Sequence, residues 1–110
     1  MKNILAILLL LISSQHISSK STRTAQAVWI DVRTLNEYQE EHIQDAILIP
    51  FDSIDSGIRK MNLAKDTEIF LYCRSGKRSN KALHTLKKAG YTNAVNIGSL
   101  ENAKKISLQR

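Results

Sequence analysis

Ile69–Lys88 reads IFLYCRSGKRSNKALHTLKK and sets a lone cysteine between a strand pattern and a helix pattern. Residues 69–72 are apolar or aromatic, too few for a helix and typical of a buried strand. After the cysteine, Ser79 is expected as a helix N-cap, and apolar residues recur at helical spacing until Gly90, a natural stop. We therefore expect Cys73 at the end of a strand, in a short loop that carries three cations.

That position predicts a reactive thiol. Backbone N–H groups of a tight loop and of a helix N-terminus attract negative charge, which lowers the pKa of a thiol and favours the nucleophilic thiolate. Arg74, Lys77 and Arg78 add positive charge that favours the thiolate and attracts an anionic substrate, and Gly76 permits a sharp turn. The alternative is a buried structural cysteine. The cluster R-S-G-K-R after Cys73 favours the reactive interpretation.

At these residues the sequence resembles a known family. Tyr72–Ser79, YCRSGKRS, looks like the active-site loop of the rhodanese domain, a sulfurtransferase fold. Similar supporting motifs stand on both sides of it: Trp29–Arg33 (WIDVR), Glu37-Tyr38, His42-Ile43, Ala46, Ile49-Pro50, Gly90–Asn93 and Asn96–Gly98. The resemblance covers about residues 28–103 and is strongest to small exported single-domain members of the phage-shock protein E type. Glu41 and Ser99 stand where the family usually has glycine.

The resemblance implies persulfide chemistry without a metal or an organic cofactor. Cys73 would be the catalytic nucleophile, taking the sulfane sulfur of thiosulfate and passing it to a thiophilic acceptor such as cyanide or a thiol. The expected partners are therefore a small anionic donor and an acceptor, for a chain acting as a monomer. The residues expected to bind the donor are Arg74, Ser75, Gly76, Lys77 and Arg78. The residues expected to support the loop structurally are Asp31, Arg33 and Ser79.

Two other functions remain open. Phosphatases of the cell-cycle dual-specificity type and arsenate reductases share the fold, but such phosphatases need five residues between cysteine and arginine, whereas four separate Cys73 from Arg78. A non-enzymatic sulfur-carrier or persulfide-binding module is the second alternative, because a carrier would also keep the cysteine. Stimulation by a protein partner would separate carrier from enzyme.

Residues 1–27 are expected to be a signal peptide and residues 28–110 the domain. Lys2 precedes the apolar run Ile4–Ile12, which is too short to span a bilayer, and Ala25-Gln26-Ala27 offers a cleavage site. Because the polar stretch before this site is long, cleavage nearer Ser14–Ser19 stays open. An uncleaved amphipathic anchor or a misassigned start is the alternative. Export predicts a periplasmic protein without stable membrane association. Without residues 1–27, thirteen Lys and Arg stand against ten Asp and Glu, so the formal charge falls from +6 to +3. No aromatic residues interleave the basic ones, which argues against nucleic-acid binding.

The remaining pattern predicts one α/β domain. Strands are expected at 28–32, 46–49, 69–72 and 94–97, and helices after Thr34, from Asp52 or Ser53, after Ser79, and over 99–105. Strands that alternate with helices predict a small parallel sheet of about four strands, flanked by helices, with the reactive loop at its carboxyl edge. His42 is expected to pack and hydrogen-bond, His84 to lie on the surface, and Trp29 to join the core.

Overall fold

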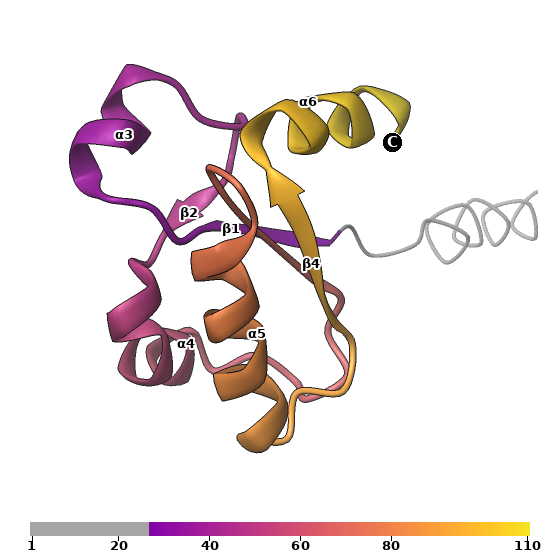
Figure 1. Ribbon diagram of the computed structural model, residues 1–110. Coiled ribbons are helices and arrows are strands. Elements are labelled where there is room, and N and C mark those ends of the chain that lie inside the picture. The colour runs from indigo at the N-terminus through magenta and orange to yellow at the C-terminus, as the bar shows by residue number, and fades with distance from the viewer. Residues whose placement is uncertain (1–26) are drawn as a thin grey trace, which may run out of the picture.

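The computed structural model describes residues 27–110, which form one parallel sheet with helices on both faces (Figure 1). The predicted signal peptide therefore lies, apart from Ala27, outside the described residues. The elements follow in the order β1 (Val28–Asp31), α3 (Leu35–Glu40), β2 (Ile47–Leu48), η2 (Phe51–Ser53), α4 (Ile54–Met61), β3 (Ile69–Cys73), α5 (Lys77–Lys88), β4 (Ala94–Ser99) and α6 (Leu100–Gln109).

The four strands lie in the order β2-β1-β3-β4, and every neighbouring pair is parallel. The predicted α/β class, the parallel sheet and its strand number are confirmed. In parallel sheets the carboxyl ends of the strands meet at one edge, so the Cys73 end of β3 lies beside the end of β4. The second strand is shorter than expected, because only Ile47 and Leu48 pair with β1.

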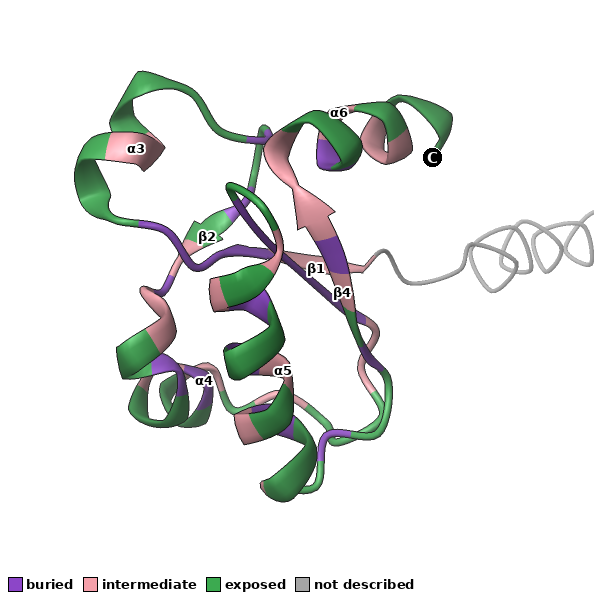
Figure 2. Cartoon of the chain, viewed as in Figure 1, coloured by how far each residue is buried: buried purple, intermediate pink, exposed green. Residues whose placement is uncertain are grey.

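The inner strand β3 is buried along its whole length (purple in Figure 2), and its side chains belong to two core clusters. Strand side chains alternate between faces. Ile69, Leu71 and Cys73 accordingly pack in the cluster that includes residues of α4 and α5. Phe70 and Tyr72 pack in the second cluster, with Trp29 and residues of α6. Two-sided burial explains why this strand reads as a continuous apolar run.

Local sequence signals place most helix ends correctly. Thr34 and Glu37 form the predicted capping box, in which the Thr34 hydroxyl accepts from the Glu37 amide and the Glu37 carboxylate accepts from the Thr34 amide. Ser99 caps α6 by accepting from the amide of Asn102. Neither Glu41 nor Ser99 has a positive φ, so the backbone at these positions does not require the glycine usual in the family.

The start of α5 corrects the expectation at Ser79. The N-cap is Gly76, with φ of +100°, and the helix begins at Lys77, so Lys77 and Arg78 lie in its first turn and not in the loop. Ser79 is fully buried within that turn. The glycine can take a left-handed conformation that L-residues avoid, and this lets the helix start closer to the cysteine than a serine cap would allow.

Candidate active site

Three residues, Arg74–Gly76, join the end of β3 to the start of α5, and the Cys73 side chain lies beneath them with 1% exposure. The turn is tight because Gly76 adopts a positive φ and its Cα faces Gly98: a Cβ at position 76 would lie 3.4 Å from the Gly98 Cα. The predicted position of the cysteine, between a strand end and a helix N-terminus at the carboxyl edge of the sheet, is confirmed.

The sulfur atom of Cys73 accepts hydrogen bonds. The Gly76 amide donates at 3.0 Å and the Ser79 hydroxyl at 3.4 Å. Burial by itself raises the pKa of the Cys73 thiol, but hydrogen bonds from the Ser79 hydroxyl and from the amides of Ser79, Gly76 and Ser75 outweigh it, so the pKa lies below its ordinary value. Uncharged donors are thus the main stabilisers of the thiolate: the loop amides that the sequence pattern predicted, and the Ser79 hydroxyl, which it did not assign to this role.

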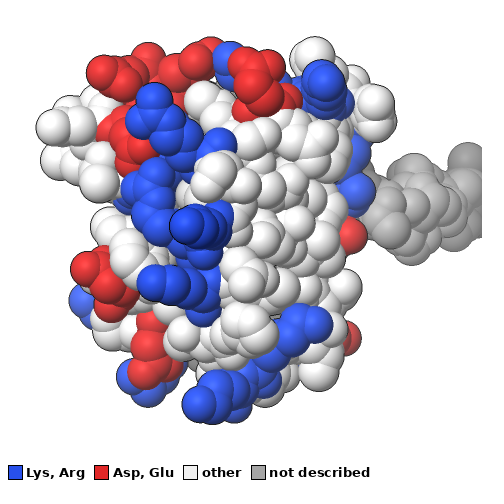
Figure 3. All heavy atoms as spheres, in the orientation of Figure 1, with Lys and Arg blue, Asp and Glu red and all other residues white. Residues whose placement is uncertain are grey.

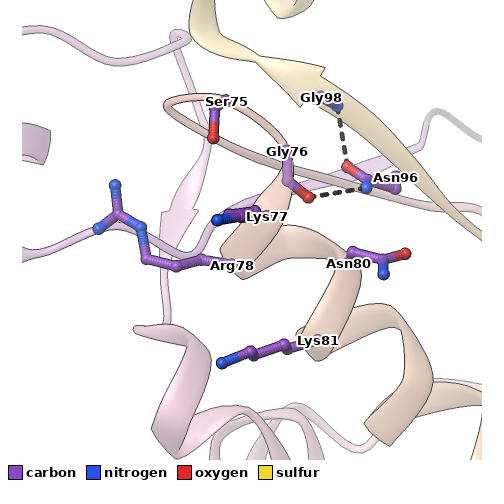
Figure 4. Close-up of a pocket in the computed structure, with 8 residues that line it drawn as sticks. All are labelled: Ser75, Gly76, Lys77, Arg78, Asn80, Lys81, Asn96 and Gly98. Carbon is purple, nitrogen blue, oxygen red and sulfur yellow. Dashed lines mark hydrogen bonds between the residues drawn. The ribbon is translucent and has the colours of Figure 1, made fainter.

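Asn96 on β4 holds the loop to the sheet, and sequence reasoning did not assign it a role in the site. Its amide nitrogen donates to the Gly76 carbonyl at 3.1 Å. Its carbonyl oxygen accepts from the Ser79 hydroxyl at 2.6 Å and from the Gly98 amide at 2.9 Å. Figure 4 shows two of these bonds as dashed lines. The sequence feature that could have indicated this role is the position of Asn96 within a predicted strand, between Val95 and Ile97, because asparagine is depleted in strands.

The cations around the loop differ in their contacts. Arg78 makes a bidentate ion pair with Glu37 of α3, with N–O distances of 2.8 and 3.0 Å. This hydrogen bonding lowers the pKa of Glu37 to about 2. Arg74 is mostly exposed and lies 3.6 Å from the same carboxylate. Lys77 is exposed and takes part in no ion pair within residues 27–110. Glu37 therefore neutralises part of the positive charge that the loop pattern predicted.

A shallow pocket of about 690 Å³ opens beside the loop (Figure 4). Figure 4 shows its residues coming from the loop, the first two turns of α5 and the end of β4. Four of the five predicted donor-binding residues contribute to it, and Arg74 does not; the lining consists of Ser75, Gly76, Lys77, Arg78, Asn80, Lys81, Asn96 and Gly98. The lining includes three cations, Lys77, Arg78 and Lys81, and no carboxylate, so the pocket suits an anionic molecule.

Asp31 and Arg33 form a buried ion pair below this region. The Arg33 guanidinium donates to both Asp31 oxygens, at 2.7 Å for the shortest contact, and also to the Glu41 carbonyl. Arg33 further lies over the ring of Tyr72, 5.6 Å from its centroid. The two residues do orient one another, and their link to Cys73 runs through Tyr72, the residue before it. Supporting the fold is the role that this geometry favours.

The other singled-out side chains lie apart from the sulfur atom. His42 stacks on Tyr38 and donates from Nδ1 to the Tyr38 carbonyl, which fits the expected packing role. His84 is exposed on α5, as expected, and Trp29 contacts Phe70 edge-to-face. Within residues 27–110, no three His, Cys, Asp or Glu side chains gather as metal ligands would, and no helix is long and apolar enough to cross a membrane.

Comparison with known proteins identifies the fold family. The family model described as the rhodanese-like domain matches residues 14–105. The chain belongs to the rhodanese family. The match begins inside the predicted signal peptide, so the boundary between leader and domain stays a prediction. Sulfur transfer is the activity that the family and the names of its relatives support.

Two curated relatives and one solved structure show the range of the family. "Thiosulfate sulfurtransferase PspE" of Escherichia coli (strain K12) is 38% identical over 74 residues, covering 67% of this chain and 71% of the relative. "Putative sulfur carrier protein YrkF" of Bacillus subtilis (strain 168) is 34% identical over 68 residues, covering 62% of this chain and 36% of the relative. The structure described as "rhodanese with anions from E. coli" superposes with a TM-score of 0.67 at 36% identity, covering 70% of this chain and 91% of that one.

Proposed function

We propose that this protein is a thiosulfate sulfurtransferase that carries sulfur as a persulfide on Cys73. The observation that carries the proposal is the set of hydrogen-bond donors around the sulfur atom: the Gly76 amide, the Ser79 hydroxyl and the neighbouring loop amides, which lower the pKa of the thiol. A thiolate is the reactive form in attack on a sulfane sulfur. The name of the relative PspE supports thiosulfate as the donor.

In the first half-reaction, the Cys73 thiolate attacks the outer sulfur of thiosulfate. A sulfur–sulfur bond forms at Cys73, and the sulfur–sulfur bond of thiosulfate breaks with its electron pair leaving on sulfite. The enzyme then holds Cys73–S–S⁻, and the total charge of −3 is the same on both sides of the step. Amides preorganised around a developing anion stabilise it without reorganisation, as donors of the oxyanion-hole type do.

In the second half-reaction, a thiophilic acceptor removes the outer sulfur. A cyanide or thiolate lone pair attacks it, the bond to Cys73 breaks, and Cys73 returns to its thiolate. No external oxidant or reductant is needed, because each half-reaction forms one bond to the transferred sulfur and breaks one sulfur–sulfur bond. We assign the donor's sulfonate to the basic side of the pocket, where Lys77 is exposed and Arg78 lines the wall. The description of the solved relative mentions anions, which supports an anionic donor.

A sulfur carrier is the second candidate function, and the name of YrkF supports it. Carrier and enzyme share the persulfide and differ in turnover: a carrier would hold its sulfur until one protein partner takes it. A phosphatase is disfavoured, because four residues separate Cys73 from Arg78, whereas phosphatases of this fold need five. We also propose export through residues 1–27 to the periplasm, with residues 28–110 as the monomeric mature domain.

The test is the intact mass of the purified protein before thiosulfate, after thiosulfate, and after cyanide. A gain of one sulfur atom (~32 Da) that cyanide removes, and that Cys73→Ser abolishes, is the expected result for a covalent cysteine intermediate. Steady turnover with cyanide supports the enzyme; a stable adduct that cyanide removes only once favours the carrier. No adduct on a free, reduced thiol would refute both. The mass of the protein isolated from its host also gives the cleavage position.

A further inference from the structure

Positive charge in the domain is concentrated in one segment. Residues 74–88 contain six Lys and Arg and no Asp or Glu. The rest of residues 28–110 contains seven Lys and Arg and ten Asp and Glu. The segment therefore carries a formal charge of +6 and the remainder of the domain −3. The net charge of +3 thus comes from this one segment, and the rest of the domain is acidic. Figure 3 shows a band of Lys and Arg, with Asp and Glu gathered mainly beside and above it.

Exposed cations of this segment recur along one side of α5. Helix positions three, four and seven apart share a face, which places Lys77, Lys81, His84 and Lys88 in one row. Arg74 precedes the row and Lys87 lies at its side. We call the exposed cations Arg74, Lys77, Lys81, Lys87 and Lys88 the basic ridge. Lys77 and Lys81 lie about 6 Å apart along the helix and Lys87 adjoins Lys88, so the charges within each pair reinforce one another inside the Debye length of about 8 Å at physiological salt. Lys81 and Lys88 lie about 10 Å apart, so salt partly screens the fields of the two pairs from each other.

Most of the basic ridge lacks an acidic partner. Among residues 27–110, Lys77, Lys81, Lys87 and Lys88 make no ion pair, whereas Lys104 of α6 pairs with Glu41 and Arg110 with Glu68. Arg74 shares the Glu37 carboxylate with Arg78 at a longer distance. Lys77 and Lys81, one turn apart, repel each other on the isolated helix, whereas Lys87 and Lys88 lie in the last turn, where the helix dipole favours cations.

The basic ridge is too long for the small donor. Twelve residues of α5 rise about 1.5 Å each, so the helix extends about 16 Å from Lys77 to Lys88. Thiosulfate would contact only the end of the ridge next to the pocket, where Lys77 and Lys81 contribute to the lining. The cations at the far end of the ridge, Lys87 and Lys88, point to a partner that extends along the helix. A partner with carboxylates spaced over a comparable length would match them all.

We propose that the basic ridge docks an acidic protein that accepts sulfur from Cys73, with its carboxylates along α5 and its thiol at the pocket. This inference rests on the proposed function. The acceptor thiolate attacks the outer sulfur of Cys73–S–S⁻, an S–S bond forms on the acceptor, and the S–S bond to Cys73 breaks, which leaves the Cys73 thiolate and a persulfide anion on the acceptor. Charge and electrons balance, and no further reactant is required. A nucleic acid is disfavoured, because no aromatic side chain stands among the residues of the ridge to stack with bases.

The experiment compares three thiol peptides of equal length as sulfur acceptors from the thiosulfate-loaded protein: one cysteine followed by glutamates, by glutamines or by lysines. We expect the glutamate peptide to react at least about fivefold faster than the glutamine peptide at low salt, and the difference to vanish at high salt, because complementary charge acts mainly on association. Equal rates for the glutamate and glutamine peptides at low salt would overturn the proposal.

A double variant, Lys87→Gln/Lys88→Gln, tests the far end of the basic ridge. It should lower the rate with the glutamate peptide roughly two- to tenfold, the range of one to two exposed ion pairs, and leave turnover with cyanide unchanged. Lys60→Gln/Lys105→Gln, on α4 and α6, removes the same charge from exposed positions outside the segment and should leave both rates unchanged. An equal loss in both double variants would refute a localised docking surface.

Binding can be measured apart from chemistry. A labelled glutamate peptide with serine in place of cysteine should bind the unmodified protein, and Lys87→Gln/Lys88→Gln should weaken it, in a fluorescence anisotropy titration. If the protein binds this peptide but forms no persulfide, the docking surface stands and the sulfurtransferase proposal fails. If a single-stranded oligonucleotide of equal charge binds as tightly as the peptide, the ridge is a general polyanion surface and the proposal of an acidic protein partner fails.

Discussion

Ser79→Ala should make Cys73 a weaker nucleophile. The Ser79 hydroxyl carries one proton and has two acceptors, the Asn96 carbonyl oxygen at 2.6 Å and the Cys73 sulfur at 3.4 Å. In the neutral site the shorter bond dominates. Once the thiol ionises, the same proton can turn to the thiolate, while Asn96 keeps the Gly98 amide as a donor. The hydroxyl thus stabilises the charged sulfur more than the neutral one, and this difference is what the substitution removes.

A hydrogen bond to a charged group contributes about 1.5–3 kcal/mol, and the long contact to sulfur places this one near the lower limit. A loss of about 1.4 kcal/mol corresponds to a tenfold smaller thiolate fraction below the pKa. The rate of alkylation by iodoacetamide, followed against pH, should therefore fall about tenfold for Ser79→Ala at the acidic end and converge with the unmodified protein at high pH.

Ser75→Ala is the matched control, because it makes the same chemical change in the loop. The Ser75 side chain is exposed, and alanine keeps the backbone amide, so its alkylation profile should not move. A thermal melt checks that Ser79→Ala still folds, since the buried hydroxyl contributes only about 1 kcal/mol to stability. Superimposable alkylation profiles for folded Ser79→Ala and the unmodified protein would contradict our account of how the thiolate is stabilised.

Three further predictions concern stability. Asp31→Asn leaves the Arg33 charge buried without its partner and should cost about 3–5 kcal/mol in urea unfolding; a loss below about 1 kcal/mol would contradict the structural role of the pair. Glu37 has a pKa of about 2 in the folded protein against 4.5 ordinarily, so its contribution to stability is complete above pH 4.5 and is lost as the pH falls towards 2. The pKa shift corresponds to about 3 kcal/mol of stability, which solvent screening reduces to about 1 kcal/mol. Glu37→Gln should therefore remove this part of the pH dependence of the free energy of unfolding. The same pH dependence in the variant and the unmodified protein would contradict the prediction. Gly76→Ala places a Cβ at a positive φ and should lower the free energy of unfolding by about 1–2 kcal/mol and slow alkylation of Cys73; an unchanged melting temperature would mean that the loop relaxes freely.

Patterns local in sequence predicted the local features of the fold. The apolar run of β3, the capping box at Thr34 and the placement of Cys73 between a strand and a helix were all expected from neighbouring residues. The N-terminus of α5 was misplaced by three residues, because the expected cap, Ser79, is a good N-cap type by itself. The N-cap is instead Gly76, which has a positive φ and lies close to Gly98, a residue more than twenty positions away.

The sequence by itself determined the reactive residue, the class of fold and the sign of the charge around the site. These properties depend on residue type and on spacing within one segment, and both can be read along the chain. Only the tertiary structure decided which groups touch the sulfur and which cations remain unpaired. Asn96 reaches the loop because β3 and β4 pair in parallel with a register shift before Gly98, and Glu37 reaches Arg78 from α3. Such contacts join residues distant in sequence, and their energies depend on distances that no local pattern contains.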